Sequence, residues 1–514
     1  MEIVRGNGAK KLKKKFNHFI TTKNLTTAKM KNSKFTLFIF FMFELTAGTL
    51  FSQWDPIVRL SNNAALSYTT PNVNSIASSG SSIHVIWQDN RGGNWEIYYR
   101  RSTNGGTTWE NERRFTNNTG ASYDPSISVS GSNVHVVWYD NHQGVPDIYY
   151  RRSTDGGNNF QSEVRISNNA GNSWRPVIFS SGSLVHITWT DERDGNKEIY
   201  YRRSNDNGAN WGTETRLTNN SAESSLNSVT ASGSSVYVVW SDTRDGDEIW
   251  FKRSTDGGVN WSSDTKLTNN TGNSTEPSIS VSGVNLQIAW RDFRDGNEEI
   301  YYKRSSDGGS SWGPDTRLTN DLNQSFSPVI SAQSSLIHVV WHDNRNGATN
   351  YEIYYKRSVN GGASWGSDER LTNQVANSSS ASITASGTAL HVAFTDGRFG
   401  SNNPEILYLR NPSGNLVSIE TVSSEIPESF SLSQNYPNPF NPVTNINFSI
   451  PKSVHVKIVI YDLMGRIVSE VVNEKLSAGT YRTDFNASHL SSGTYFYRIE
   501  AGEFISVKKM ILVK

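Results

Sequence analysis

One pattern recurs seven times along this chain, at intervals of 50 to 53 residues. Each copy holds an apolar run that ends in a large aromatic residue, an aspartate two positions later, and then a run such as Glu-Ile-Tyr-Tyr. The aromatic residue stands at Trp87, Trp138, Trp189, Trp240, Trp290, Trp341 and Phe394. Self-similarity at a fixed period of this length is typical of propellers and solenoids, in which each unit buries its apolar surface against its neighbours.

Each unit contains four strand-like runs separated by turn residues. In the second unit these runs are residues 125–130, 134–140, 147–153 and 162–166. The second run is apolar on both faces, as expected of a strand enclosed between packed sheets. Four short strands per unit are typical of a propeller blade, so the sequence predicts an all-β fold.

The two ends of the repeat region determine the predicted number of blades. Residues 54–63 match the fourth run of a unit, residues 211–220, but no first three runs precede them. The seventh unit has second and third runs at 390–396 and 405–410 and lacks a clear fourth. We therefore expect the N-terminal run to complete the last unit and close a seven-bladed propeller without an open edge. A six-bladed ring is the alternative.

A hairpin motif, Ser-x-Asp/Asn-x-Gly-x-x-Trp/Phe, occurs in six of the units. Its Asp/Asn and aromatic members are Asn104, Trp109, Asp155, Phe160, Asp206, Trp211, Asp256, Trp261, Asp307, Trp312, Asn360 and Trp365. The acidic or amide side chain can accept backbone N–H bonds, glycine takes the positive φ of a tight turn, and the ring folds onto apolar surface. A calcium loop needs several oxygen ligands, and each motif offers one carboxylate at most, so we expect no metal and no cofactor.

The motif resembles the Asp-box of the sialidase, or BNR-repeat, superfamily over about residues 54–411. The resemblance implies that the boxes are structural and lie on the face away from an active site. It also implies that catalysis would need three arginines, a tyrosine paired with a glutamate, and an aspartic acid. The family's Arg-Ile-Pro motif is missing, and only Trp174-Arg175-Pro176 lies at a comparable place. An exo-sialidase-type glycoside hydrolase therefore remains an alternative function, with Arg175, Asp124, Glu276 and Tyr123 as its candidate participants.

Two further sets of polar residues repeat with the units. An aspartate and an arginine two positions apart follow the second run, as in Asp191/Arg193 and Asp292/Arg294. We expect these pairs to neutralise each other and to brace the loop, with acids such as Glu198 and Glu299 as additional partners. Histidines share one position in five units and are replaced by Tyr237 and Gln287 in the other two. Metal ligands must converge on one ion, so we expect the histidines to pack or form hydrogen bonds within each sheet. The five are His84, His135, His186, His338 and His391.

The functional prediction depends on the residues that differ between the units. Just before the first run of each unit, at the expected mouth of the ring axis, the sequence varies between units. The candidate ligand-binding residues there are Tyr123, Asp124, Trp174, Arg175, Glu276 and Phe326. Aromatic rings supply stacking area and charged groups fix orientation, which suits a sugar. We therefore favour a non-catalytic binding module for a glycan or another extracellular polymer; an architectural adhesin is a further alternative. Trp95, Phe399 and Tyr351 form a weaker aromatic group on the outer loops.

The N-terminal segment, residues 1–52, has the features of an export signal. Basic residues precede an apolar run at 35–43, which is too short for a stable membrane span, and small residues follow it. The basic run at 10–15 precedes this signal, so we expect no nucleic-acid partner and, after signal removal, no transmembrane span.

The composition changes after residue 411, and we expect a propeller at 53–411, a linker at 412–429 and a separate domain at 430–514. The last segment contains Asn-Tyr-Pro-Asn-Pro-Phe-Asn-Pro at 435–442 and Lys-Lys-Met at 508–510. It resembles the type A C-terminal sorting domain of type IX secretion. The resemblance implies a small β-sandwich, the type IX secretion machinery as partner, and a secreted or outer-membrane-surface location in a bacterium. The chain has no cysteine, so disulfides do not hold either domain.

Overall fold

The computed structural model describes residues 54–347, 349–400, 403–412, 419–423, 425–487 and 490–513. The regular secondary structure in these residues is all β-strand. None of the described residues lies in a helix that could cross a membrane. The predicted signal peptide lies outside the described residues.

Residues 58–411 form seven antiparallel sheets, numbered here in chain order by their second strands. The first strands are β2 (Ser67–Tyr68) and β3 (Ile76–Ser79) in sheet 1, then β7 (Ser122–Ser130), β11 (Ser173–Ser181), β15 (Ser224–Ser232), β19 (Ser274–Ser282), β23 (Ser325–Gln333) and β27 (Ser378–Ser386). The second strands are β4 (Ser82–Asp89), β8 (Asn133–Asp140), β12 (Leu184–Asp191), β16 (Ser235–Asp242), β20 (Asn285–Asp292), β24 (Leu336–Asp343) and β28 (Ala389–Asp396). The third strands are β5 (Glu96–Ser102), β9 (Asp147–Ser153), β13 (Glu198–Ser204), β17 (Glu248–Ser254), β21 (Glu299–Ser305), β25 (Glu352–Ser358) and β29 (Glu405–Asn411). The fourth strands are β6 (Arg113–Arg114), β10 (Val164–Arg165), β14 (Thr215–Arg216), β18 (Thr265–Lys266), β22 (Thr316–Arg317), β26 (Glu369–Arg370) and, in sheet 7, β1 (Val58–Arg59).

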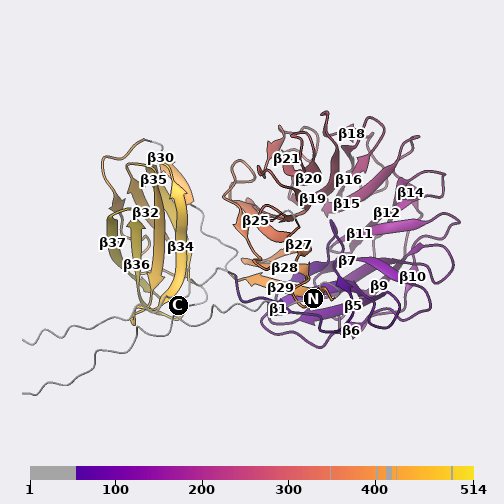
Figure 1. Cartoon of the computed structure of the whole chain (residues 1–514), viewed down its shortest axis with the longest axis horizontal. Coiled ribbons are helices and arrows are strands. Elements are labelled where there is room, and N and C mark those ends of the chain that lie inside the picture. The colour runs from indigo at the N-terminus through magenta and orange to yellow at the C-terminus, as the bar shows by residue number, and fades with distance from the viewer. Residues whose placement is uncertain are drawn as a thin grey trace, which may run out of the picture. The chain divides into compact units, whose positions relative to one another are not determined.

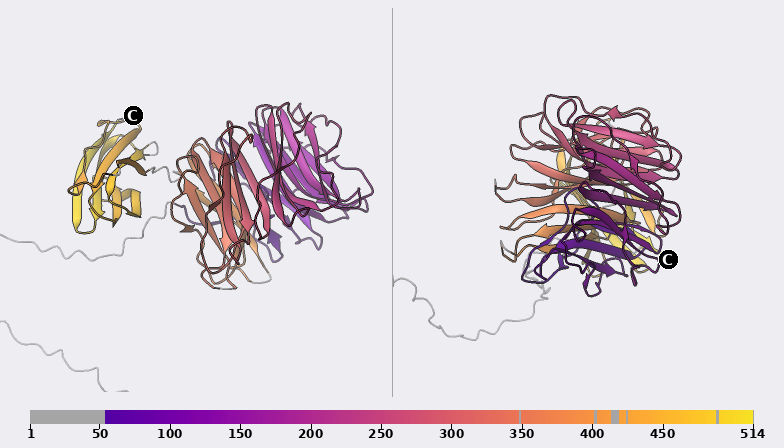
Figure 2. Two further views of the ribbon diagram at one scale, coloured as in Figure 1. Left: turned by 90° about the horizontal axis from the view of Figure 1, so that it is seen from above. Right: turned by 90° about the vertical axis from the view of Figure 1, so that its right-hand side faces the viewer.

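The sheets follow one another around a common centre (Figure 1). The first strand of each sheet contacts the first strand of the next, and β27 of the last sheet contacts β3 of the first. Views from the side show the sheets packed face to face (Figure 2). The N-terminal strand β1 pairs with β29, with Val58 opposite Tyr408, so the predicted completion of the last unit by the N-terminal run is confirmed.

The second strands form the centre of the packing. In β8, Val136, Val137 and Trp138 have no exposed surface, because both faces of the strand are covered. The apolar clusters of the repeat region join neighbouring sheets: Val137 of sheet 2, for example, shares a cluster with Trp189 of sheet 3. Val73, between β2 and β3 of sheet 1, also belongs to the cluster that joins sheets 3 and 4. A single sheet therefore cannot bury its own apolar surface, as the repeat predicts.

The boxes are turns stabilised by their own side chains. In sheet 2 the Ser153 hydroxyl donates to Asp155 Oδ1 at 2.7 Å and accepts the Gly157 N–H at 2.9 Å. The Asp155 carboxylate accepts the Asn159 N–H at 2.9 Å. Hydrogen bonds from Asn159 and Ser153 hold the pKa of Asp155 well below its usual value.

The boxes also fasten each sheet to the one before it. Phe160 packs edge-to-face on Tyr99 of sheet 1, with ring centroids 5.2 Å apart. Gly157 leaves room for the Tyr99 hydroxyl, since a Cβ there would lie 2.1 Å from that oxygen. Tyr99 Oη in turn lies 2.6 Å from His84 Nδ1. We call this unit of box glycine, box aromatic and preceding aromatic ring the clasp.

The clasp also closes the ring. The box of sheet 1 places Trp109 4.8 Å from Tyr408 of sheet 7. The box motif of sheet 7 has decayed in sequence, and Trp54 from the N-terminal run packs on Tyr355 of sheet 6 at 5.5 Å instead. The chain termini of the repeat region are thus held by the same contact that joins the other sheets.

Residues 419–512 form two further four-stranded sheets. One has the order β30 (Ile419–Ser423), β35 (Gly479–Asn486), β32 (Val443–Ile450) and β31 (Ser431–Leu432). The other has the order β34 (Ile467–Leu476), β33 (Val454–Tyr461), β36 (Gly493–Ala501) and β37 (Phe504–Leu512). The two sheets share one core, which includes Phe448, Ile458, Tyr497 and Met510. β30 lies in the segment predicted to be a linker, because that segment supplies an edge strand that pairs with β35.

The repeated histidines are buried without charge. Their Nδ1 atoms lie 2.6 to 2.8 Å from the hydroxyl of the neighbouring tyrosine in the third strand. Burial lowers the pKa of His84, His135 and His186 to about 4, and that of His338 and His391 to about 3. The imidazoles therefore serve as neutral hydrogen-bonding and stacking groups within the sheets, as predicted.

The clasp predicts different effects for the two adjacent glycines of one box. Gly157→Ala must displace the Tyr99 hydroxyl and adopt φ +82°, so we expect a loss of about 2 to 5 kcal/mol in the free energy of unfolding. Gly156→Ala also requires a positive φ but meets nothing within 4 Å, so it should lose only about 1 to 2 kcal/mol. Guanidinium chloride unfolding measures both. Equal losses would contradict the clasp.

The buried histidines predict that acid destabilises the protein between about pH 6.5 and 4. In this window the unfolded chain binds more protons than the folded chain, because the folded-state pKa values lie below 6.5, and stability therefore falls as pH falls. Each histidine should remove about 1 to 2 kcal/mol at pH 5. His135→Gln should reduce the loss between pH 7 and pH 5 by that amount, since Gln287 already bonds a tyrosine at the equivalent position. An unchanged loss in chemical unfolding would contradict the assignment.

Candidate functional site

We had expected the predicted ligand-binding residues just before the first strands. They lie within these strands instead. Pairing with the second strand starts earlier, at Ser122 opposite Asp140, and a β-bulge follows between Tyr123 and Ser126. The second residue of each variable pair has positive φ although none is glycine. These residues are Asp124 (47°), Arg175 (49°), Leu226 (54°), Glu276 (57°), Ser327 (50°) and Ser380 (52°). Bulges re-aim side chains, and a left-handed non-glycine residue costs about 1 to 2 kcal/mol, so the strain at this end of the ring is repeated from sheet to sheet.

Opposite each bulge lies a variable residue that sequence reasoning missed. It stands between the repeated tryptophan and aspartate of the second strand: Tyr139 pairs with Tyr123, Arg291 with Thr275, and His342 with Phe326. Strand side chains alternate, so this residue faces away from both of its repeated neighbours. The variation of this residue between units was the sequence feature from which it could have been predicted. The seven residues are Gln88, Tyr139, Thr190, Ser241, Arg291, His342 and Thr395.

Five rings from sheets 1 to 3 form a continuous aromatic ladder. The successive members are Tyr68, Trp95, Tyr123, Tyr139 and Trp174, with centroid distances of 5.9, 5.9, 5.3 and 6.2 Å. All five are half-buried, so each keeps part of its surface in solvent. Trp95, which we had predicted in a separate outer group, belongs to this ladder.

Two charged residues adjoin the ladder. The Asp124 N–H donates to Gln88 Oε1 at 3.0 Å. Burial raises the pKa of Asp124, and the charge of Arg175 opposes this shift. Arg175 is exposed. The predicted residues Tyr123, Asp124, Trp174 and Arg175 therefore belong to one surface.

The other two predicted residues, Glu276 and Phe326, belong to a charged cluster on sheets 5 and 6. Arg291 lies 3.5 Å from Glu276 and 3.6 Å from Glu298. The rings of Phe326 and His342 stack at 5.6 Å. Tyr351 lies 5.9 Å from Phe326, so this aromatic residue also belongs here.

Burial perturbs two titratable groups of the charged cluster. It raises the pKa of Glu298, an effect that the charge of Arg291 opposes. It lowers the pKa of His342 to about 4. Phe399, the third member of the predicted outer group, instead lies against the Arg59 guanidinium at 3.8 Å.

The repeated aspartate–arginine loops are neutralised internally. In sheet 5, Arg294 donates to both oxygens of Asp292, at 2.8 and 2.6 Å, and to Asp315 at 2.7 Å. Its guanidinium lies over the Tyr301 ring at 4.3 Å. Burial acts to raise the pKa of Asp292, but the bonds from Arg294 and Trp290 outweigh it and the pKa lies below its usual value. These arginines are therefore already satisfied by protein carboxylates.

The additional partners of these arginines differ from our expectation. Glu198 and Glu299 bind Arg216 and Arg317 of the fourth strands, at 2.9 and 2.8 Å. The reason is the pairing of the third and fourth strands, which places these two charges side by side. Besides the aspartate two positions before it, the loop arginine pairs with a second carboxylate in sheets 1, 3, 4, 5 and 6. These second carboxylates belong to Glu112, Glu214, Asp264, Asp315 and Asp368.

The described residues of the mouth do not assemble the catalytic set of a sialidase. Two arginines, Arg175 and Arg291, occupy the variable first- and second-strand positions, and they belong to different clusters. Arg291 is already paired with two glutamates. Burial raises the pKa of Tyr123 and Tyr139, which makes both phenols weaker nucleophiles.

The described residues also contain no group of three or more histidine, aspartate or glutamate side chains that could hold a metal ion.

Two family models match the chain. Residues 141–340 match the BNR repeat-like domain, and residues 434–514 match the secretion system C-terminal sorting domain. None of the curated proteins matches the chain in sequence.

Several solved structures are similar at low identity. A protein of unknown function from Dyadobacter fermentans is 14% identical over 59% of this chain and 96% of its own, with a TM-score of 0.44. The phage phi92 endosialidase is 10% identical over 74% of this chain and 73% of its own, with a TM-score of 0.45. A Trypanosoma rangeli sialidase in complex with 2,3-difluorosialic acid is 13% identical over 89% of each chain, with a TM-score of 0.41. At these values the similarity carries no activity over to this chain.

The repeat, the boxes and the two family matches agree on the domain content. The chain therefore carries a BNR repeat-like propeller domain and a C-terminal sorting domain that directs it through type IX secretion to the cell surface or the extracellular space.

Proposed function

We propose that residues 53–411 are a closed seven-bladed propeller whose mouth binds a glycan without cleaving it, and that residues 430–514 are a small β-sandwich used for export. The seven consecutive sheets, the contact between β27 and β3, and the pairing of β1 with β29 support the blade count. The single core shared by the two C-terminal sheets supports the sandwich.

The aromatic ladder is the observation that carries the binding function. Sugar rings present C–H faces that pack on aromatic rings, and five half-buried rings in sequence offer stacking area for more than one sugar unit. Asp124 and Arg175 lie beside the ladder, where a carboxyl group and a guanidinium can bind sugar hydroxyls and fix the orientation of the chain. The strained bulges present these side chains from rigid strands, which lowers the entropy cost of binding.

Binding is favoured over hydrolysis by the state of the carboxylates. Most glycoside hydrolases need two carboxyl groups free to act as acid and nucleophile or base. In the charged cluster both Glu276 and Glu298 are paired with the same arginine, Arg291. Glu276 also accepts the Ser327 N–H at 3.0 Å. These contacts support a role for both glutamates in holding Arg291 and the bulge of sheet 6.

A glycan array with the purified full-length chain, followed by calorimetry on the polysaccharide that binds, tests the proposal. Trp95→Ala removes a ring within the ladder and Trp174→Ala removes its last ring, and each should weaken binding by about five- to thirty-fold, the usual effect of truncating an aromatic contact. Tryptophan fluorescence should also change on binding. Phe399→Ala is the control, because that exposed ring lies against Arg59 and outside the ladder. Absence of binding to every glycan, or binding that neither tryptophan variant weakens, would contradict the proposal.

A further inference from the structure

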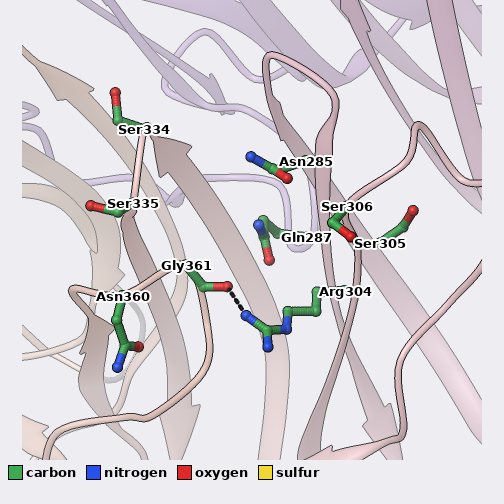
Figure 3. Close-up of a pocket in the computed structure, with 9 residues that line it drawn as sticks. All are labelled: Asn285, Gln287, Arg304, Ser305, Ser306, Ser334, Ser335, Asn360 and Gly361. Atoms are coloured by element: carbon green, nitrogen blue, oxygen red, sulfur yellow. Dashed lines mark hydrogen bonds between the residues drawn. The ribbon is translucent and has the colours of Figure 1, made fainter.

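A pocket lies between sheets 5 and 6, at the end of the strands opposite the aromatic ladder. It is a pocket of about 220 Å³ whose polar lining includes Asn285, Gln287, Arg304, Ser335 and Asn360 (Figure 3). Asn285 begins β20, whereas the mouth residues lie near the end of the second strands, so the pocket is separate from the aromatic ladder. At about 30 Å³ per molecule, its volume corresponds to about seven waters, the size of a small polar ligand.

One residue of the pocket lining departs from the repeat. Gln287 occupies the position that holds histidine in five sheets and tyrosine in sheet 4. Elsewhere a ring fills this space against the third strand, as His338 does on Tyr355 at 5.9 Å and Tyr237 on Phe251 at 6.3 Å. Glutamine is only one heavy atom smaller than histidine, but it has no ring to stack on the third strand, so it contributes a carboxamide to the lining of this pocket.

Gln287 also leaves a donor directed at this space. The residue is 2% exposed, and its Oε1 accepts the Tyr302 hydroxyl. Among the described residues Nε2 has no hydrogen-bond partner, and Figure 3 shows the carboxamide in the middle of the lining. This N–H group is therefore available to an acceptor within the pocket.

Arg304 adds a positive charge. Its Nη1 donates to the Gly361 carbonyl at 2.8 Å, as Arg203 donates to Gly257 at 2.7 Å in sheet 3. In sheet 1 the equivalent Arg101 also has a carboxylate partner, Glu110 at 2.8 Å. Gly313 replaces that glutamate in sheet 5, and no described carboxylate forms an ion pair with Arg304. A guanidinium with unused donors is suited to a carboxylate.

A second departure from the repeat lies at the rim. Ser334 adopts φ +55° in the hairpin turn where the other six sheets have glycine. The strained serine places a hydroxyl beside the pocket, next to Ser335 (Figure 3). Two departures from the repeat thus coincide at one junction between sheets.

We propose that this pocket binds a small hydroxylated carboxylate about the size of one sugar ring, such as a uronate. The Arg304 guanidinium takes the carboxylate, and the amide of Gln287 and the rim hydroxyls take the ligand's hydroxyl groups. The pocket has no aromatic side chain, which distinguishes it from a stacking site for neutral sugars. Because it lies away from the ladder, its function does not depend on glycan binding at the mouth.

Saturation-transfer NMR with the full-length chain and glucuronate, glucose and acetate as probes tests the proposal. We expect glucuronate to bind at least about ten-fold more tightly than either of the other two, since a charged hydrogen bond and the hydroxyl contacts both contribute. Arg304→Gln should weaken glucuronate binding by about ten-fold or more. Gln287→His removes the carboxamide from the lining and restores the ring of the repeat, so it should weaken binding. Because the other sheets tolerate that ring, this variant should still fold.

Arg203→Gln is the matched control for Arg304→Gln. It breaks the equivalent bond to the next box, so it should cost similar stability and leave glucuronate binding unchanged. Absence of glucuronate binding would overturn the site, and equal binding of glucose would overturn the carboxylate assignment. Undiminished binding by Gln287→His would overturn the placement.

Discussion

The clasp between a box and the aromatic ring of the preceding sheet is the contact on which the repeat region depends. A glycine such as Gly157 permits the Tyr99 hydroxyl to approach, and an aromatic residue such as Phe160 covers the tyrosine ring. Every sheet buries apolar residues against its neighbours, so the spacing that the clasp sets also determines how completely the cores pack. Trp54 extends the same contact to the last sheet, whose own box is lost.

The repeated residues that stabilise the ring differ from the residues that are available to a ligand. The box serines and aspartates bond their own turns, the buried histidines bond tyrosines, and the loop arginines are held by protein carboxylates. These groups are used in stabilising the ring and have little capacity left for a ligand. Side chains that differ between the units and keep exposed surface or available donors lie in the aromatic ladder at one end of the strands and around Gln287 at the other.

The sequence predicts most of the architecture because the period, the turn motif and the split last unit are local patterns. The match of residues 54–63 to a fourth strand was enough to predict the pairing of β1 with β29. Contacts set by strand register were harder to predict. The acid beside each loop arginine comes from a residue about 20 positions later, so Glu214 was missed as the partner of Arg193 and Glu198 was chosen instead.

Contacts set by strand register also explain why only part of the candidate site was predicted from the sequence. Tyr123 and Trp174 were found because they vary between units, but the ring that joins them, Tyr139, sits inside an otherwise invariant motif. The bulge also could not be read from composition, since non-glycine residues adopt its positive φ. The replacement of histidine by Gln287 was visible in the sequence, whereas the pocket that this residue lines depends on the packing of two sheets.

Closure of the ring by the N-terminal strand is the central claim, and hydrogen exchange of residues 54–63 tests it most directly. The amides of Asp55 and Leu60 donate to the carbonyls of Arg410 and Ile406, at 2.7 and 2.8 Å. If these bonds close the ring, we expect mass spectrometry to show the segment exchanging as slowly as the third strands, because it opens only when the ring unfolds. Exchange at the rate of an unprotected peptide would contradict the closed ring.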